Sequence, residues 1–228
     1  MGVIHTISDW DKSAFFFLNG FHNDLMDNVM ALFTLTSTWL IFYGVTLYLI
    51  IRKYGRKSIP VIISLVLIIL LSDQIAGLLK HGVMRLRPSQ DPAVKPLAHI
   101  FFTTGGLYGF VSAHAANAFS FATFSALLFR SRGYAIFIYP WACLIAYTRI
   151  YLGVHYPGDI LGGILLGTLV GWGVYRLLLL AEDRAFPVHP YQRNKLTHNE
   201  LEVIVITATM VVFFTVSTVV LLLQNDLL

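Results

Sequence analysis

Apolar residues fill long stretches of this chain, and short polar connections separate them. Six stretches come close to the roughly 20 apolar residues that a membrane-spanning helix needs: residues 28–51, 58–79, 111–130, 133–150, 159–181 and 203–224. Ahead of them, residues 10–21 mix phenylalanines with polar positions, as is typical of an amphipathic helix in the membrane interface. The pattern predicts an all-α protein: a single domain over residues 1–228, built as a polytopic membrane bundle of six transmembrane helices with an N-terminal interfacial amphipathic helix.

Composition supports a surface that faces lipid. Hydrophobic residues make up 57% of the chain and charged residues 12%, whereas a soluble domain carries about 25% charged residues. The single cysteine, Cys143, excludes an internal disulfide and a thiolate metal cluster, and its apolar surroundings predict a core position. The net charge of +4 comes from scattered basic residues, which favour membrane topology and anion binding over nucleic-acid recognition.

Basic residues gather in alternate connections of the predicted bundle. Ten of the sixteen Lys and Arg residues lie in or near the connections that follow spans 1, 3 and 5: Arg52, Lys53, Arg56, Lys57, Arg130, Arg132, Arg176, Arg184, Arg193 and Lys195. Positive residues mark cytoplasmic loops. We therefore expect a multi-pass protein of the cytoplasmic (inner) membrane, with both termini and the connections 80–110 and 150–158 facing the periplasm or the cell exterior.

The outer connections nevertheless carry cations and histidines, which runs against this trend and calls for a local chemical reason. These residues are Lys80, Arg85, Arg87, Lys95, Arg149, His81, His99, His114 and His155. Three short clusters among them have patterns that indicate phosphate chemistry.

The first cluster places Lys80 and Arg87 seven residues apart, with Pro88 directly after them. An arginine offers a bidentate fork for phosphate oxygens, and a lysine offers a point charge. Pro88 stiffens the chain beside the arginine. The cluster indicates a phosphate-binding pair; the alternative is an interfacial anchor that touches lipid headgroups.

The second cluster, Val111-Ser112-Ala113-His114, opens the third apolar stretch. Serine is a favoured helix N-cap, and the free N–H groups of a helix N-terminus bind anions. His114 is then expected in the first helical turn, close to a bound phosphate. The alternative is a capped helix with an interfacial histidine.

The third cluster runs from Thr148 and Arg149 to His155 and Asp159. The last two are four residues apart and lie on one face if the segment is helical. The carboxylate can then hold one imidazole nitrogen and leave the other free to attack, as in a nucleophile positioned by a third group. Arg149 adds another phosphate fork. The alternative is a polar network at a helix end, although ionisable residues near a membrane core are functional by default.

Together the clusters resemble the signature of the type-2 phosphatidic-acid phosphatase superfamily, whose membrane members are lipid phosphatases. That signature reads K-x6-R-P, then P-S-G-H, then S-R-x5-H-x3-D. The chain has the first motif in full, from Lys80 to Pro88, and the third with Thr148 in place of serine. In the second, Val111 replaces proline and Ala113 replaces glycine. The alanine keeps the backbone N–H but adds a methyl group near the phosphate.

The resemblance implies a role for each residue. His155 would attack phosphorus and form the phosphoenzyme, Asp159 would orient it, and His114 would protonate the leaving oxygen and later activate water. The residues that would hold the phosphoryl oxygens are Lys80, Arg87, Ser112, Ala113 and Arg149. Catalysis of this kind rests on positioning and electrostatics, so no metal or other cofactor is expected.

The implied substrate is an amphiphile that is reached from the membrane interface. Similar enzymes act on undecaprenyl diphosphate, phosphatidylglycerol phosphate, phosphatidic acid or lipid A phosphates. We favour a polyprenyl diphosphate or phosphatidylglycerol phosphate here. The expected partners are this lipid and the bilayer, with neither nucleic acid nor an obligate protein partner.

Three other functions stay open at this point. An anion transporter would carry its ionisable residues at the bilayer midplane, whereas here they gather at one end. A vanadate-dependent haloperoxidase belongs to the same superfamily, but such enzymes are soluble. A catalytically inert relative that binds lipid phosphates would fit the altered second cluster.

Three charged residues carry further expectations. Asp73 lies two helical turns before Lys80 and should either pair with or orient it, or make a buried polar contact inside the bundle. Arg85 and Lys95 should either steer anionic headgroups toward the site or remain solvated loop charges.

Two groups of glycines predict backbone features. A turn-rich, flexible connector is expected before the third apolar stretch, at Gly105, Gly106 and Gly109, with a lid as the alternative. A ridge on which another helix can pack closely is expected in the fifth stretch, at Gly163, Gly167 and Gly171, with a hinge as the alternative.

Overall fold

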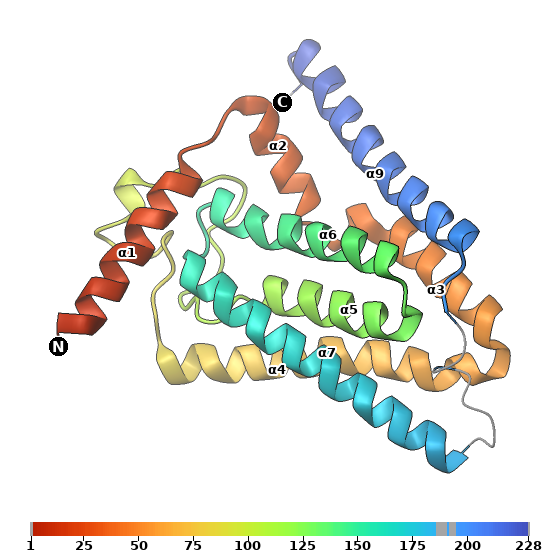
Figure 1. Ribbon diagram of the computed structural model, residues 1–228. Helices are drawn as coiled ribbons and strands as arrows, with labels where there is room; N and C mark the ends of the chain where they lie inside the picture. Colours follow the sequence, from red (N-terminus) through yellow and green to blue (C-terminus); the bar gives the residue numbers. More distant parts are fainter. Residues whose placement is uncertain (1, 186–190, 192–194, 228) are drawn as a thin grey trace.

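The computed structural model describes residues 2–185, 191 and 195–227, and over these residues the regular structure is helical (Figure 1). In chain order the elements are α1 (Gly2–Asn19), α2 (Asp24–Phe33), η1 (Thr36–Trp39), α3 (Leu40–Tyr54), η2 (Gly55–Lys57), α4 (Ser58–Val83), η3 (Lys95–Leu97), α5 (Ala113–Phe129), α6 (Arg132–Tyr151), α7 (Pro157–Ala185) and α9 (His198–Gln224), the η elements being short 3-10 turns. The all-α prediction is confirmed. Arg193, one of the cations expected on the cytoplasmic side, lies outside the described residues.

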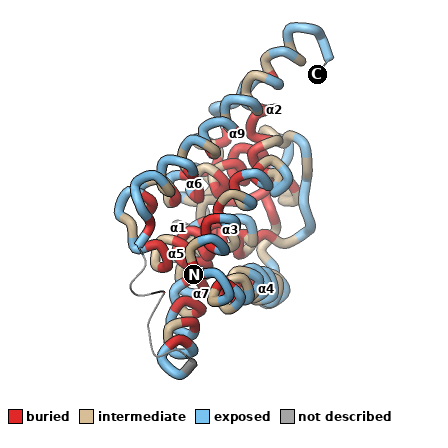
Figure 2. Tube along the Cα trace, turned by 90° about the vertical axis from the view of Figure 1, so that its right-hand side faces the viewer, coloured by how far each residue is buried: buried red, intermediate tan, exposed pale blue. Residues whose placement is uncertain are grey.

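Among the described residues, three helical stretches are long and apolar enough to cross a membrane: Thr36–Val83, Pro157–Arg184 and His198–Gln224. The central helix α5 is apolar as well, but shorter. Helices α4 and α9 carry long exposed faces (Figure 2), on which large apolar side chains are exposed, among them Ile63, Leu70, Phe213 and Phe214. Apolar faces of this length are rare on water-soluble monomers and are stable against lipid tails.

The first expected span, residues 28–51, is not one helix. Helix α2 ends at Phe33, and α3 begins only at Leu40. The break has a local cause, because the hydroxyl of Thr38 donates to the carbonyl of Leu32 at 2.6 Å and the indole N–H of Trp39 donates to that of Phe33 at 2.9 Å. These side chains satisfy carbonyls that a continuing helix would have used.

Cys143 is exposed rather than buried in the core, so this expectation is wrong. It shares the outer face of α6 with Ile136 and Pro140, which are also exposed. An apolar run has the same composition whether a face meets lipid or the protein core, and the sequence alone does not separate the two.

Helix α5 is the centre of the bundle. It packs against α4, α6 and α7, and most of its side chains are buried. On its α7 side it presents small residues one turn apart, Ser112, Ala116 and Ser120. Small side chains at this spacing let a neighbouring helix come close to the α5 backbone.

Helix α7 meets α5 through the predicted glycine ridge. A Cβ atom at Gly163 would lie 2.6 Å from the carbonyl oxygen of Ser112, and one at Gly167 would overlap the carbonyl of Ala116. The two backbones are thus closer than any side chain on α7 would permit. The predicted close-packing ridge is confirmed, and it sets the N-termini of α5 and α7 side by side.

Four helix ends meet at one side of the bundle, at the left in Figure 1: α4 and α6 end there, while α5 and α7 begin there. Helix α1 and the connection between α4 and α5 lie across these ends. The side chain of Asn19, the last residue of α1, fastens them together, since it donates to the carbonyls of His99, Ile150 and Tyr151 at 2.9, 3.1 and 2.8 Å. All three sequence clusters fall at this end.

We predict that Gly167→Ala destabilises the bundle by about 1–3 kcal/mol, because the added methyl group overlaps the Ala116 carbonyl. Gly173→Ala is the matched control on the same helix, since its methyl group would meet nothing within 4 Å. Thermal unfolding in detergent should show a lower midpoint for Gly167→Ala and an unchanged or higher one for Gly173→Ala. Equal midpoints in the two variants would contradict close packing at the ridge.

Candidate active site

His155 lies in the short connection between α6 and α7 and is 1% exposed. Gly153, with a φ of +73°, turns the chain after α6, and the N–H of His155 then donates to the carbonyl of Arg149 at 3.2 Å. Glycine is required at this turn, because a Cβ atom there would collide with the carbonyl of His99. The turn fixes the backbone that carries His155.

Both ring nitrogens of His155 have partners. Nδ1 lies 3.3 Å from Oδ2 of Asp159, and Nε2 lies 3.0 Å from Nη1 of Arg87. Arginine has only donors, so Nε2 accepts this hydrogen bond and Nδ1 carries the proton toward the carboxylate. Nε2 therefore presents a lone pair, which is the state that a nucleophilic imidazole needs.

Burial keeps His155 in this neutral state. Desolvation is the largest cause that lowers its pKa well below the usual 6.5, followed by the positive charges of Arg87, Arg149 and Lys80. Arg87 contacts the ring and the other two cations lie near enough to act on it, so the structure brings residues of the first and third clusters to one place. At neutral pH the ring is uncharged, and the lone pair of Nε2 accepts the hydrogen bond from Arg87.

Asp159 is fully buried in the first turn of α7. Besides facing His155, its Oδ2 accepts the N–H of Tyr156 at 3.0 Å, and its Oδ1 accepts a hydrogen bond from Arg85 at 3.1 Å. A buried carboxylate is costly unless it is paired and hydrogen-bonded. Arg85 and Tyr156 therefore stabilise the charge that orients His155.

Arg85 also pairs with Asp11 of α1, at 2.6 Å, and its guanidinium carbon lies 4.3 Å from the ring centre of Tyr156. Asp11 in turn accepts the N–H of Gly158, in the first turn of α7, at 2.8 Å. Arg85 is thus a partly buried link between two carboxylates, and neither role expected from the sequence describes it. Two features of the sequence could have indicated this link: the carboxylate of Asp11 in an aromatic N-terminal segment, and the position of Arg85 two residues before Arg87.

Arg87 is held by the connection that precedes α5. Its Nε donates to the carbonyl of Tyr108 in this connection at 3.1 Å, and its Nη1 donates to the carbonyl of Val154, between α6 and α7, at 3.3 Å. Glycines permit this approach, because a Cβ at Gly105 would lie 2.8 Å from Nη1 of Arg87 and one at Gly109 would lie 2.7 Å from Oδ2 of Asp159. At these two positions the expected flexible connector is instead packed tightly against the site.

Ser112 caps α5, and His114 lies in the first turn, as predicted. The hydroxyl oxygen of Ser112 accepts the N–H of Ala115 at 3.4 Å, and its own N–H donates to the carbonyl of Asp159 at 3.0 Å. His114 is exposed and, together with Ala113, lines a cavity of about 710 Å³. The second cluster is thereby attached to the third through the backbone of Asp159.

Arg149 and Lys80 lie in the last turns of α6 and α4. Arg149 is 5% exposed, donates to the hydroxyl of Thr34 at 2.6 Å, and has no partner for its Nε. A buried guanidinium N–H without a partner is costly, and a bound anion would satisfy it. Lys80 is partly exposed at the same end of the bundle, whereas Lys95 and His81 are exposed on the surface.

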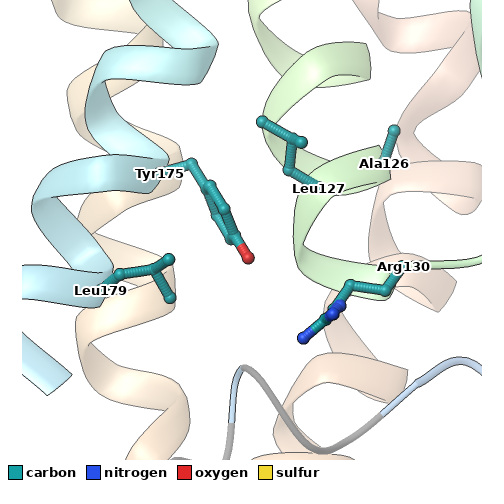
Figure 3. A pocket seen from close by; sticks show the side chains of 5 residues that line it. All are labelled: Ala126, Leu127, Arg130, Tyr175 and Leu179. Carbon is teal, nitrogen blue, oxygen red and sulfur yellow. The ribbon is translucent and has the colours of Figure 1, made fainter. Parts of the chain in front are cut away.

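Two cavities lie along α5. The one beside His114 is bounded by α3, α4, α5 and α6 and adjoins the candidate site. The other, of about 480 Å³, lies near the opposite end of α5, where Tyr175 and Arg130 point into the space between α5 and α7 (Figure 3); its lining consists of Ala126, Leu127, Arg130, Tyr175 and Leu179. None of the three clusters contributes to this second cavity.

Comparison with known proteins identifies the family. The sequence model of the PAP2 superfamily matches residues 61–182, which is more than half of the chain. This range includes all three clusters. The Lipid A 4'-phosphatase of Bacteroides thetaiotaomicron is 37% identical over 179 residues, which cover 76% of this chain and 79% of that protein. The Lipid A 4'-phosphatase of Porphyromonas gingivalis is 34% identical over 191 residues and 81% of each chain.

The fold has a solved counterpart as well. The crystal structure of LpxE from Aquifex aeolicus resembles this chain with a TM-score of 0.58 at 25% identity, covering 72% of this chain and 93% of that one. Sequence clusters, fold and relatives agree, and the prediction of a phosphatase is confirmed. The chain belongs to the PAP2 superfamily of membrane lipid phosphatases.

Proposed function

We propose that this protein hydrolyses the terminal phosphate of a membrane lipid through a phosphohistidine on His155, without a metal ion. The observation that carries the proposal is the His155 ring held between Asp159 and Arg87, with Nε2 as the acceptor. A phosphoryl oxygen can replace Nε2 as the acceptor of the Arg87 hydrogen bond. The lone pair is then free to attack phosphorus while Asp159 keeps the ring in place.

The reaction has two steps. In the first, Nε2 of His155 attacks phosphorus, the bond from phosphorus to the lipid oxygen breaks, and His114 gives its proton to that oxygen. In the second, His114 takes a proton from water, the water oxygen attacks phosphorus, and the nitrogen–phosphorus bond breaks to release inorganic phosphate. Each histidine thus ends the cycle in the protonation state in which it began.

The phosphoryl oxygens are held by cations and by the start of α5. Lys80, Arg87 and Arg149 neutralise the charge that spreads over these oxygens in the transition state. Ser112 contributes by capping the start of α5. The N–H of Ala113, in the first turn of α5, donates a further hydrogen bond to the phosphoryl oxygens. The unpartnered Nε of Arg149 supports this assignment, because it gains an acceptor when phosphate binds.

We infer a phosphorylated glycolipid of the lipid A type as the substrate. The sequence alone favoured a polyprenyl diphosphate or phosphatidylglycerol phosphate. Similarity to two Lipid A 4'-phosphatases, over 79% and 81% of their lengths, supports a lipid A phosphate instead. The cavity beside His114 is lined mainly by apolar side chains and suits an amphiphile.

We further propose six crossings of the cytoplasmic membrane, with the site at the outer face. The broken pair α2 and α3 makes the first crossing, and α4, α5, α6, α7 and α9 make the others. Cations at the end opposite the site, among them Arg52, Lys53 and Arg132, support this orientation. Helix α1 exposes Trp10 and Phe17, which supports an interfacial position for it.

Arg85 is proposed to position the nucleophile. It contacts Asp159 and not His155, so it acts through the carboxylate that holds the ring. Its second ion pair, with Asp11, brings α1 into the support of the site.

Purified protein in detergent with EDTA should release phosphate from lipid A, and His155→Ala should release none above background, because no other group forms the phosphoenzyme. A panel of lipid mono- and diphosphates identifies the preferred substrate. His81→Ala, which changes an exposed histidine outside the site, is the control and should keep the wild-type rate. Turnover that survives in His155→Ala, or activity that EDTA removes and Mg²⁺ restores, would rule out the mechanism.

Arg85→Gln should lower kcat about 10- to 100-fold and leave KM within about twofold, because it loosens the nucleophile without touching the lipid. Arg85→Lys should recover part of the loss, since it restores the charge. The control is Lys95→Gln, in the same connection but at an exposed position. A higher KM with unchanged kcat would show instead that Arg85 steers lipids toward the site.

A cysteine at Leu97, which is 73% exposed in the outer connection, should react with a membrane-impermeant maleimide in intact spheroplasts. The native Cys143 is replaced by serine so that the label reports one position. A cysteine at Arg56, between α3 and α4, should react only after permeabilisation. The reverse pattern would place the site on the cytoplasmic side.

A further inference from the structure

A polar pair beside His114 has no part in the reaction described above. Asn117 lies three residues after His114 on α5, so the two side chains share one face of the helix, and both line the cavity of about 710 Å³. From α4, Asp73 lines the same cavity and accepts a hydrogen bond from the amide of Asn117 at 2.9 Å. Asp73 therefore makes a polar contact between helices, but its side chain is exposed and not buried as expected. The pair lies one helical turn from the group proposed to protonate the leaving oxygen.

This pair has more acceptors than donors. The hydrogen bond between the two side chains uses one N–H of Asn117 and one oxygen of Asp73. The amide oxygen of Asn117 is buried and has no partner, and the carboxylate of Asp73 offers further lone pairs. A buried acceptor without a donor is costly, and the exposed carboxylate beside it can accept O–H or N–H groups from a ligand in the cavity.

Beyond the pair the cavity becomes apolar. Its lining along α4, with increasing distance from the site end of that helix, consists of Leu70, Ile69, Val66, Leu65 and Ile62. A ligand that follows this gradient has hydrogen-bond donors near Asn117 and hydrocarbon deeper between the helices.

We propose that Asp73 and Asn117 form a subsite for the leaving group, one that accepts hydrogen bonds from the hydroxyl or amide N–H groups of a glycolipid head; the inference rests on the phosphatase function proposed above. The leaving oxygen lies at His114, so the next atoms of the leaving group lie against Asn117, one turn further along α5. A sugar ring brings several donors to this place.

A polyprenyl diphosphate does not match the same subsite. Its leaving group is a lipid phosphate, which carries negative charge where the carboxylate of Asp73 lies and brings no sugar hydroxyl. The subsite therefore selects glycolipid phosphates in two ways, by hydrogen bonds to the right head group and by charge repulsion of the wrong one.

Two variants test this selectivity through kcat/KM for phosphate release from lipid A and from undecaprenyl diphosphate in the same detergent. Asn117→Leu should lower the ratio of kcat/KM for lipid A to kcat/KM for undecaprenyl diphosphate about tenfold, through lost lipid A turnover. A hydrogen bond to a buried acceptor contributes roughly that factor. Asp73→Asn, nearly isosteric, should lower the same ratio mainly by raising diphosphate turnover. Ser64→Ala, whose hydroxyl is bonded within α4, is the control and should leave the ratio unchanged.

Equal losses on both lipids in Asn117→Leu, or wild-type ratios in both variants, would overturn the subsite. The proposed function fails if turnover does not require His155. The subsite is tested separately, by a binding measurement that needs no turnover. In a His155→Ala background, lipid A should raise the thermal unfolding midpoint, and adding Asn117→Leu should remove about half of that rise or more. An equal rise with and without Asn117→Leu would overturn the subsite even if no lipid is hydrolysed.

Discussion

The close contact between α5 and α7 is the constraint on which the candidate site depends. No side chain separates the two helices where Gly167 faces the carbonyl of Ala116. At the site end the contact continues into the hydrogen bond from the N–H of Ser112 to the carbonyl of Asp159, 3.0 Å long. The helix start that carries His114 is thereby fixed beside the turn that carries Asp159. Clusters far apart in the sequence meet because a row of glycines lets two backbones touch.

Ion pairs between opposite charges stabilise the rest of the site. The carboxylate of Asp159 lies between His155 and Arg85, and Asp11 continues the chain of pairs into α1. Removing one partner of a buried pair leaves the other charge uncompensated, which costs about 3–5 kcal/mol when burial is complete. These pairs are therefore interdependent, and the N-terminal helix becomes part of the support for the nucleophile. Such a support gives Nε2 of His155 a fixed direction before any lipid arrives.

Much of the candidate site could be predicted from the sequence by short-range rules. A cation, histidine or aspartate in an apolar chain is costly and needs a reason, so the three clusters stood out, and the cap at Ser112 and the glycine ridge followed from short-range geometry. Pairings between residues that are far apart in the sequence could not be predicted in this way. Arg85 looks like one more loop cation, since nothing near it marks a partner 74 residues away at Asp11. The break at Thr38 and the exposed position of Cys143 could not be predicted either, because composition alone records neither side-chain bonds to the backbone nor which face of a helix is exposed.

The central claim is that His155 becomes phosphorylated, and trapping the intermediate tests it most directly. An activated phosphate ester labelled on phosphorus needs no acid for its leaving group, so His114→Ala should form the phosphoenzyme from it and hydrolyse that intermediate slowly. The account predicts an acid-labile, alkali-stable label that accumulates in this variant and maps to the peptide containing His155. Label on another residue, or turnover without any enzyme-bound label, would contradict it.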